Sequence, residues 1–285
     1  MRNRPVAAPG PALASPRSNV LVEELETIWR HRQLIAALTS RDLKARYRGS
    51  VLGFFWSLAN PLLLLGVYTL IFGHFFTRPG GVDPYSVFLF TGILPWTFFA
   101  GAILESTTAV AGNAGLIKKV MFPAEALPLV VVLSHLVHFL LALPILFVAL
   151  GVAGFLGKIT FGWPLLLVPV LMLLQTMLVA GISLVVASAS VLFRDLRDLV
   201  ANLMQLAFFL TPIIYYLGDI GSPTLRSLLR VNPMTSFAIG YQDVFFFARW
   251  PNGLDMSLMV IWAFAFLALG FVVFDRLRDT LAEAI

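Results

Sequence analysis

Glu105, His135 and His138 lie in long apolar stretches of this sequence and carry groups that could do acid–base or metal chemistry. The two histidines are three residues apart, which places them on one helical face. A metal site or a proton relay would need carboxylates beside them, and only Glu125 lies nearby in their stretch of the chain. We therefore expect His135 and His138 to pack or to form hydrogen bonds between helices.

Glu105 is costly to place in lipid, so it is a functional candidate by default. One acid is too few for a proton relay, and no second embedded carboxylate is evident that would complete the acid pair of glycosyl chemistry. Pairing with a base of the segment before the first apolar stretch would explain Glu105. We expect a structural or gating role, with Arg46, Arg48 and Glu105 as the interface or gating candidates.

Other catalytic signals are missing from the sequence. No GxxxxGK[ST] phosphate-binding loop occurs, so this chain alone is not expected to hydrolyse ATP. Cysteine is absent, which excludes disulfides and thiolate metal sites. We predict no catalytic residue, no metal site and no cofactor in this chain.

Composition places the chain in a membrane. Of its 285 residues, 59% are hydrophobic and only 12% are charged, whereas a soluble domain carries about 25% charged residues. Absence of charge over long stretches is typical of a polytopic helical membrane protein. The net charge of +5 comes from bases at the edges of those stretches, which favours topology and anionic-lipid contact over nucleic-acid binding.

Six stretches are predicted to cross the membrane as helices. The basic residues between them divide unevenly, with fifteen on the side of the N terminus and five on the other. Because Lys and Arg resist translocation, both termini are predicted to be cytoplasmic. Pro95 is expected to break the second stretch. The predicted spans are 51–76, 85–110, 126–156, 163–192, 199–217 and 254–274.

The remaining segments complete the predicted organisation. Residues 1–19 are rich in Pro, Ala and Arg and are predicted to be a disordered cytoplasmic tail. Residues 20–48 are predicted to form an amphipathic helix region along the inner membrane surface. The six-span domain covers 49–275, and 276–285 form a second cytoplasmic tail.

Between the fifth and sixth spans, Ser222-Pro223 and Asn232-Pro233 each place an N-cap residue before a proline suited to the first helical position. We predict two short helices that dip into the outer leaflet and return. An ordinary extracellular loop is the alternative.

Two predicted cytoplasmic segments carry side chains suited to a partner surface. Apolar groups exposed to the cytosol need a partner, and short elements between spans suit docking to a motor subunit. The alternative is that both segments are ordinary turns resting on lipid. The coupling candidates are Leu116, Ile117, Lys118, Lys119, Phe122, Arg194 and Asp195.

Four motifs carry a family resemblance: KARYRGSVLGFFWSLANPLL, LIKKVMFPAEALP, LFRDLRDL and NPMT, in this order. With them, the chain from 21 to 278 resembles the permease subunit of type-2 ABC exporters for cell-surface polysaccharides, which carry O-antigen, capsule and teichoic acid chains. The resemblance implies an all-α permease of the bacterial inner membrane that moves a lipid-linked polysaccharide outward. It implies a second copy of the chain and two separate ATP-binding subunits, which would bind ATP and Mg²⁺. It also implies a coupling helix at 116–122 and a re-entrant helix pair after residue 218.

Aromatic residues in the first and fifth spans fit the passage of a polymer, because many weak stacking contacts let a chain slide. Each ring could instead face lipid or core. An exporter of drugs or small lipids is the alternative within transport, and an intramembrane glycosyl or acyl transferase is a more distant one. The channel-lining candidates are Phe54, Tyr68, Phe72, Phe208, Tyr215 and Tyr216.

Overall fold

The computed structural model describes residues 26, 28–46, 48–49, 55–72, 82–113, 115, 123–193 and 195–284, with side chains up to residue 277. In this part of the chain the regular elements are helices without any strand, which confirms the predicted all-α class. The predicted tail 1–19 lies outside the described residues. The elements are α2 (Arg32–Arg46), α3 (Trp56–Leu70), α4 (Tyr85–Ser106), η4 (Ala111–Asn113), α6 (Ala126–Phe155), η5 (Trp163–Leu167), α7 (Val168–Leu192), α8 (Leu196–Leu210), η6 (Leu217–Asp219), α9 (Pro223–Leu229), α10 (Pro233–Phe245) and α11 (Gly253–Ala284).

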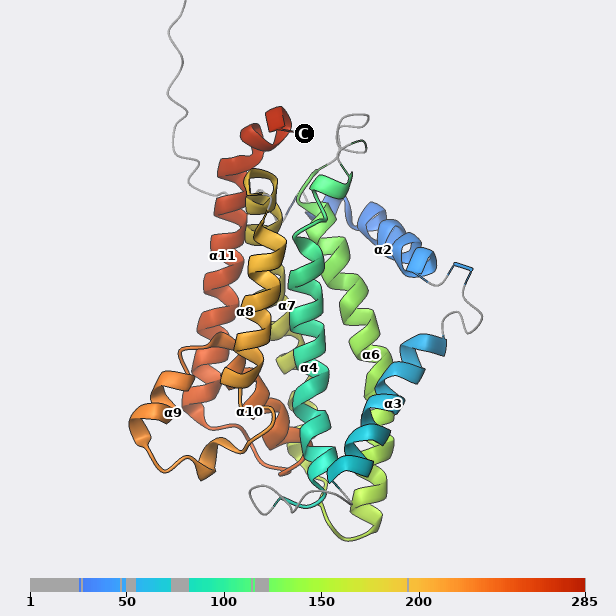
Figure 1. Ribbon diagram of the computed structural model, residues 1–285, viewed down its shortest axis with the longest axis vertical. Helices are drawn as coiled ribbons and strands as arrows, with labels where there is room; N and C mark the ends of the chain where they lie inside the picture. The colour runs from blue at the N-terminus through green and yellow to red at the C-terminus, as the bar shows by residue number, and fades with distance from the viewer. Residues whose placement is uncertain are drawn as a thin grey trace, which may run out of the picture.

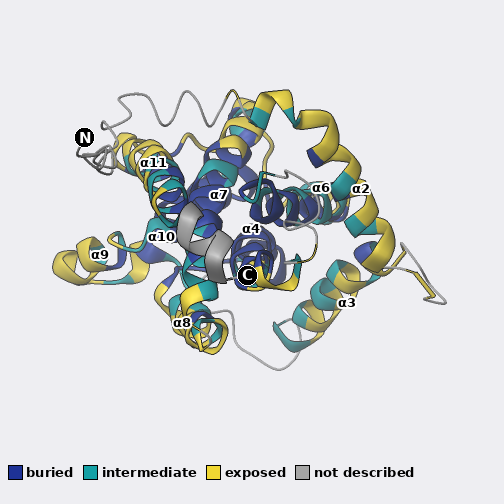
Figure 2. Cartoon of the chain, turned by 90° about the horizontal axis from the view of Figure 1, so that it is seen from above, coloured by how far each residue is buried: buried dark blue, intermediate teal, exposed yellow. Residues whose placement is uncertain are grey.

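Four helical segments are long and apolar enough to cross a membrane: α4, α6, η5 with α7, and α11 as far as Leu277. The bounds of α6 and of η5 with α7 agree closely with the predicted spans. Helices α3 and α8 have 15 residues each, which is short of the roughly 20 that a span needs. They lie on either side of α4 in both views (Figures 1 and 2). The count of six spans therefore stays a prediction.

Helix α4 is the centre of the bundle and is buried along most of its length (Figure 2). Contrary to the prediction, it continues through Pro95 without a break. Proline costs a helix one backbone hydrogen bond, and in a membrane bundle neighbouring helices and side chains hold such a helix together. Here a hydrogen bond between helices ties α4 to α7 at the proline, because the side chain of Gln175 donates to the Pro95 carbonyl at 2.8 Å.

Helices α7 and α11 approach each other very closely because glycines face each other. A Cβ added to Gly181 would lie 2.2 Å from the Phe266 carbonyl group, and one added to Gly270 would lie 2.5 Å from the Gly181 carbonyl oxygen. Small residues of this kind let membrane helices pack backbone to backbone. This contact fixes α11 against α7.

Helices α9 and α10 begin at the predicted caps. The Ser222 hydroxyl accepts from the Leu225 amide, and Asn232 Oδ1 accepts from the Met234 amide at 3.0 Å. Helix α10 is buried from Met234 to Phe245, whereas most of α9 is exposed (Figure 2). Burial in protein satisfies the condition for a short polar helix at membrane depth, but whether the pair re-enters the membrane stays a prediction.

Helix α2 lies at the opposite end of the bundle from α9 and α10 (Figure 1). Its buried Ile35 packs with Ala126 and Val130 at the start of α6. The last turns of α11 lie at the same end as α2, and the predicted C-terminal tail is helical as far as Ala284. We call these two ends of the bundle the α2 end and the α10 end.

Candidate functional site

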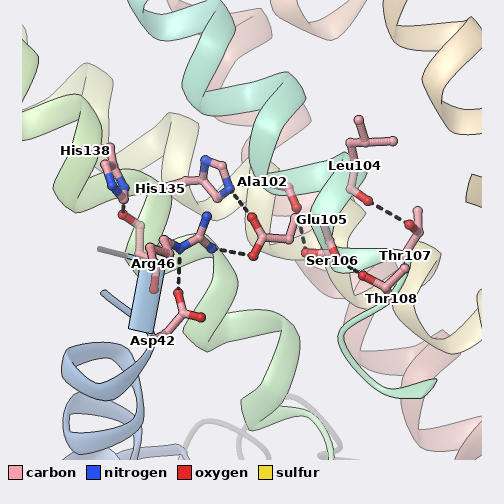
Figure 3. A network of polar contacts seen from close by, with 11 residues as sticks. Asp42, Arg46, Ala102, Leu104, Glu105, Ser106, Thr107, Thr108, His135 and His138 are labelled. Atoms are coloured by element: carbon pink, nitrogen blue, oxygen red, sulfur yellow. Dashed lines mark hydrogen bonds and ion pairs between the residues drawn. The ribbon is translucent and has the colours of Figure 1, made fainter. Parts of the chain in front are cut away.

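A charged cluster joins three helices at the α2 end (Figure 3). Arg46, in the last turn of α2, forms an ion pair with Glu105 near the end of α4 and a second one with Asp42 at 2.9 Å. The other oxygen of Glu105 lies 2.8 Å from Nε2 of His135 on α6. Two predictions are confirmed here: Glu105 pairs with a base of the preceding segment, and His135 makes a hydrogen bond between helices.

The cluster ties α2, α4 and α6 together. About a quarter of the Arg46 side chain and a third of Glu105 are exposed (26% and 36%). Burial lowers the pKa of the Arg46 guanidinium, but hydrogen bonds and charges from Glu105 and Asp42 outweigh this and raise it above its ordinary value. No group of three metal-ligating side chains occurs in the described residues. Arg48, the other gating candidate on this segment, is exposed just after α2.

A cavity of about 510 Å³ lies beside this cluster, between α3, α4 and α6. Arg46 and His135 belong to its wall, so the charged cluster meets the cavity directly. His138 lies one helical turn along α6, and its Nδ1 is 2.8 Å from the Ser134 carbonyl. The other polar residues that line the cavity are Ser57, Asn60 and Thr97.

At the α10 end, aromatic rings from four separate segments touch in series. The series starts with Tyr68 on α3 and Phe72 just after it, and the Phe72 ring is 4.6 Å from that of Tyr85. Tyr85 contacts Phe88 at 6.0 Å on α4. Phe88 then packs edge-on against Phe246 and Phe247, which directly follow α10. Tyr216 ends the series, with its ring centre 5.3 Å from that of Phe247.

Arg249 fixes the far end of this ring series. Its guanidinium lies 4.6 Å above the Phe247 ring and donates to the Tyr216 hydroxyl at 3.1 Å. A hydrogen bond to Asp243, 2.8 Å long, holds the guanidinium in place. Burial lowers the pKa of Arg249, and the bonds to Tyr216 and Asp243 more than compensate, so that the pKa is raised. Gly218 leaves room for this arrangement, because an added Cβ would lie 2.2 Å from the Tyr216 ring.

The remaining candidates have other surroundings. Phe208 packs edge-on against Trp96 of α4, so this ring contributes to the contact between α8 and α4. The Tyr215 hydroxyl lies 3.4 Å from the Phe209 carbonyl, away from the ring series. Asp195 is exposed where α8 begins. Outside the described residues are Phe54, Leu116, Ile117, Lys118, Lys119, Phe122 and Arg194.

Sequence reasoning missed several residues at the α10 end. Tyr85, Phe88 and Phe247 complete the ring series, and the run of three phenylalanines before Arg249 was a signal that could have drawn attention to it. It also missed Asp255, which is fully buried in the first turn of α11. Arg230 binds both carboxylate oxygens of Asp255, at 2.9 and 3.2 Å. This pair fastens the α9–α10 connection to α11.

Comparison with known proteins identifies the family. The model of the ABC-2 type transporter family matches residues 33–246, which is most of the chain. The chain belongs to the ABC-2 type transporter family. Its membership confirms the predicted resemblance, and it makes the chain a transmembrane subunit of a transporter, not an enzyme.

Individual relatives agree with this assignment. The chain is similar to an O-antigen export system permease protein of Myxococcus xanthus, with 34% identity over 93% of this chain and 100% of the relative. A protein of the same description from Klebsiella pneumoniae is 31% identical over 88% of this chain and 94% of the relative. A polysialic acid transport protein of Escherichia coli is 22% identical over 86% of this chain and 93% of the relative.

Proposed function

We propose that this ABC-2 chain is the permease subunit of an ATP-driven exporter that moves a lipid-linked polysaccharide across the bacterial inner membrane, from the cytoplasmic to the outer side. The α2 end faces the cytoplasm in this proposal, with both termini, and the α10 end faces outward. Relatives along nearly the whole chain are named as exporters of O-antigen or transporters of polysialic acid, which supports a polysaccharide as the cargo.

The ring series at the α10 end is the observation that carries the proposal. Flat aromatic faces offer apolar surface to the C–H edges of sugar rings, and tyrosine adds a polar edge. A polymer that slides needs several weak contacts in succession, because one strong site would hold it. Buried rings of the series, Tyr85, Phe88 and Phe246, hold its half-buried rings in one region of the bundle. The half-buried rings supply such a succession: Tyr68, Phe72, Phe247 and Tyr216.

A pathway for a polymer also needs a second wall, and a second copy of the chain would supply it. Helix α8 exposes four leucines at spacings of four, three and four residues, which lie on one helical face: Leu199, Leu203, Leu206 and Leu210. Such a face fits close packing against the same helix of another copy. This observation supports a homodimer with α8 near its axis.

Energy would come from two ATP-binding subunits that bind ATP and Mg²⁺ and dock at the α2 end. The segment 116–122 and Asp195 are the proposed contacts. Movement there could reach the helices through the Arg46–Glu105–His135 cluster, because it links α2 to both α4 and α6. In this sense Arg46 and Glu105 are proposed gating residues.

The experiment deletes the gene for this chain and restores it on a plasmid together with its ATP-binding subunits. Deletion should abolish surface polysaccharide and leave lipid-linked polymer on the cytoplasmic side, and the wild-type chain should restore export. Unchanged surface polysaccharide after deletion would refute the proposed function.

The restored strain also tests the ring series. Tyr216→Leu should lower surface polysaccharide per assembled complex several-fold, because it removes a flat face and a polar edge worth about 0.5–1.5 kcal/mol. Phe264→Leu is the matched control, since that ring is exposed on α11 away from the series. Equal effects of both substitutions would place the pathway elsewhere.

A further inference from the structure

A separate hollow of about 480 Å³ opens at the α10 end, in a size range usual for small-molecule sites. Four stretches that are far apart in the sequence form its wall: the residues just before α4, the connection from α6 to η5, the region of η6, and the segment that follows α10. We call this feature the α10-end hollow. Its lining combines two kinds of groups, aromatic rings and charged or hydroxyl side chains.

The aromatic side of the hollow is held rigidly. Tyr216 and Phe247 line it, half-buried, with their ring centres 5.3 Å apart. Arg249 contacts both rings, and its charge is matched by Asp243. The chain turns back at Ala248, whose φ of 49° lies in the left-handed region, and the Arg249 amide then donates to the Asp243 carbonyl at 2.9 Å. The two rings therefore present a fixed surface.

The polar side of the hollow carries more acid than base. Lys158 and Asp83 form an ion pair at 3.0 Å, with about a third of each side chain exposed. Asp219 adds a second, exposed carboxylate and Thr160 an exposed hydroxyl. Among the residues that the structure describes, the lining carries one formal negative charge, because Asp219 adds to the Lys158–Asp83 pair. This charge disfavours an anionic ligand such as a phosphate or a uronic acid relative to an uncharged or cationic one.

We propose that the α10-end hollow is a saccharide-binding subsite that takes uncharged or amine-bearing sugar units. Rings would receive the C–H face of a sugar, and the carboxylates would accept hydrogen bonds from its hydroxyl or ammonium groups. The subsite rests on the proposed function, since the exported polymer supplies its ligand. It adds a discrete place at the end of the ring series, with a charge preference that the rings alone would not give.

The experiment measures binding to the purified full-length chain in phosphatidylcholine nanodiscs by saturation-transfer NMR titration. Three tetrasaccharides serve as probes: uncharged mannotetraose, the cationic glucosamine tetramer, and anionic tetragalacturonate. The first two should bind in a saturable manner, and tetragalacturonate should bind at least several-fold more weakly. Gly218→Ala, which displaces the Tyr216 ring, should weaken mannotetraose binding about three- to tenfold. Phe264→Leu, outside the hollow, should change nothing.

Asp219→Lys tests the charge preference without a risk to folding, because Asp219 is exposed. This substitution should reverse the order and favour tetragalacturonate over the glucosamine tetramer. The subsite is refuted if the wild-type chain binds none of the three probes, or if Gly218→Ala and Asp219→Lys leave affinities and their order unchanged. Binding is measured without transport, so the two proposals fail separately. If the purified chain binds no probe but still restores surface polysaccharide in the deletion strain, the subsite alone is refuted. If the chain binds the probes but its deletion leaves surface polysaccharide unchanged, the proposed function alone is refuted.

Discussion

The buried pair of Arg230 and Asp255 should be one of the most sensitive points of the fold. Oδ1 of Asp255 accepts from Arg230 and from the Ser236 hydroxyl at 3.3 Å, and Oδ2 accepts from Arg230 and from the side-chain Nδ2 of Asn252 at 2.5 Å. Asp255→Asn keeps the shape of the side chain but turns one oxygen into an NH₂ group. Whichever oxygen is replaced, the new NH₂ group faces an N–H of Arg230, which can only donate, so the variant cannot satisfy its surroundings.

The size of the effect follows from burial. Asp255 is fully buried and the Arg230 side chain is 21% exposed, so removing either partner leaves a largely buried charge without its counter-charge. Breaking a buried pair in this way costs about 3–5 kcal/mol. For a chain of this size that lowers the unfolding temperature by on the order of 10 °C. Both Asp255→Asn and Arg230→Met should lower the unfolding temperature by this amount.

The assay is thermal unfolding of the detergent-purified chain followed by tryptophan fluorescence, with limited proteolysis at the exposed α9 as a local readout. The double variant Arg230→Met with Asp255→Asn removes both charges and should be no less stable than either single variant. Asp219→Asn, an exposed acid at the same end, should change the free energy of unfolding by less than about 0.5 kcal/mol. Single variants that melt like the wild type, or a double variant whose loss equals the sum of the single losses, would refute the reasoning.

Two further predictions concern the α2 end and the packing between helices. Glu105→Gln should detach α2 from α4 and lower export, measured as surface polysaccharide. Asp42→Asn removes only a partner four residues away on the same helix, an ion pair worth about 0.3–0.5 kcal/mol, and should lower export much less. Equal losses of export in both variants would contradict a link through α4. Gly181→Leu and Gly270→Leu should each force α7 and α11 apart and sharply lower the yield of folded chain on size-exclusion chromatography, while Gly221→Ala, with open space around its Cα, should leave the yield unchanged. Normal yields for both leucine variants would show that the close glycine contact is dispensable.

Local rules in the sequence determined much of the architecture. Long uncharged stretches predicted α6 and η5 with α7 almost to the residue, because an apolar segment of that length has few alternatives to a buried or membrane helix. Ser222-Pro223 and Asn232-Pro233 located the starts of α9 and α10, because capping depends on neighbouring residues only. The need of Glu105 for a basic partner also followed from its type and place, since an unpaired charge there is costly.

Only the tertiary structure decided which residues meet. The partners of Glu105 lie 59 and 30 residues away, and nothing in the local pattern selects Arg46 or His135 from the other bases and histidines. Continuity of α4 through Pro95 likewise depends on packing by other helices, which outweighs the lost hydrogen bond.

Aromatic residues show the same limit most clearly. In a chain that is apolar almost throughout, a ring facing lipid, core or a pathway has the same neighbours in sequence, so Phe208 and Tyr216 were equal candidates. The fold separates them, because Phe208 packs on α4 whereas Tyr216 joins rings from α3, α4 and the segment after α10. Which rings form a series is set by the approach of four distant segments, and that approach follows from the packing of the whole bundle.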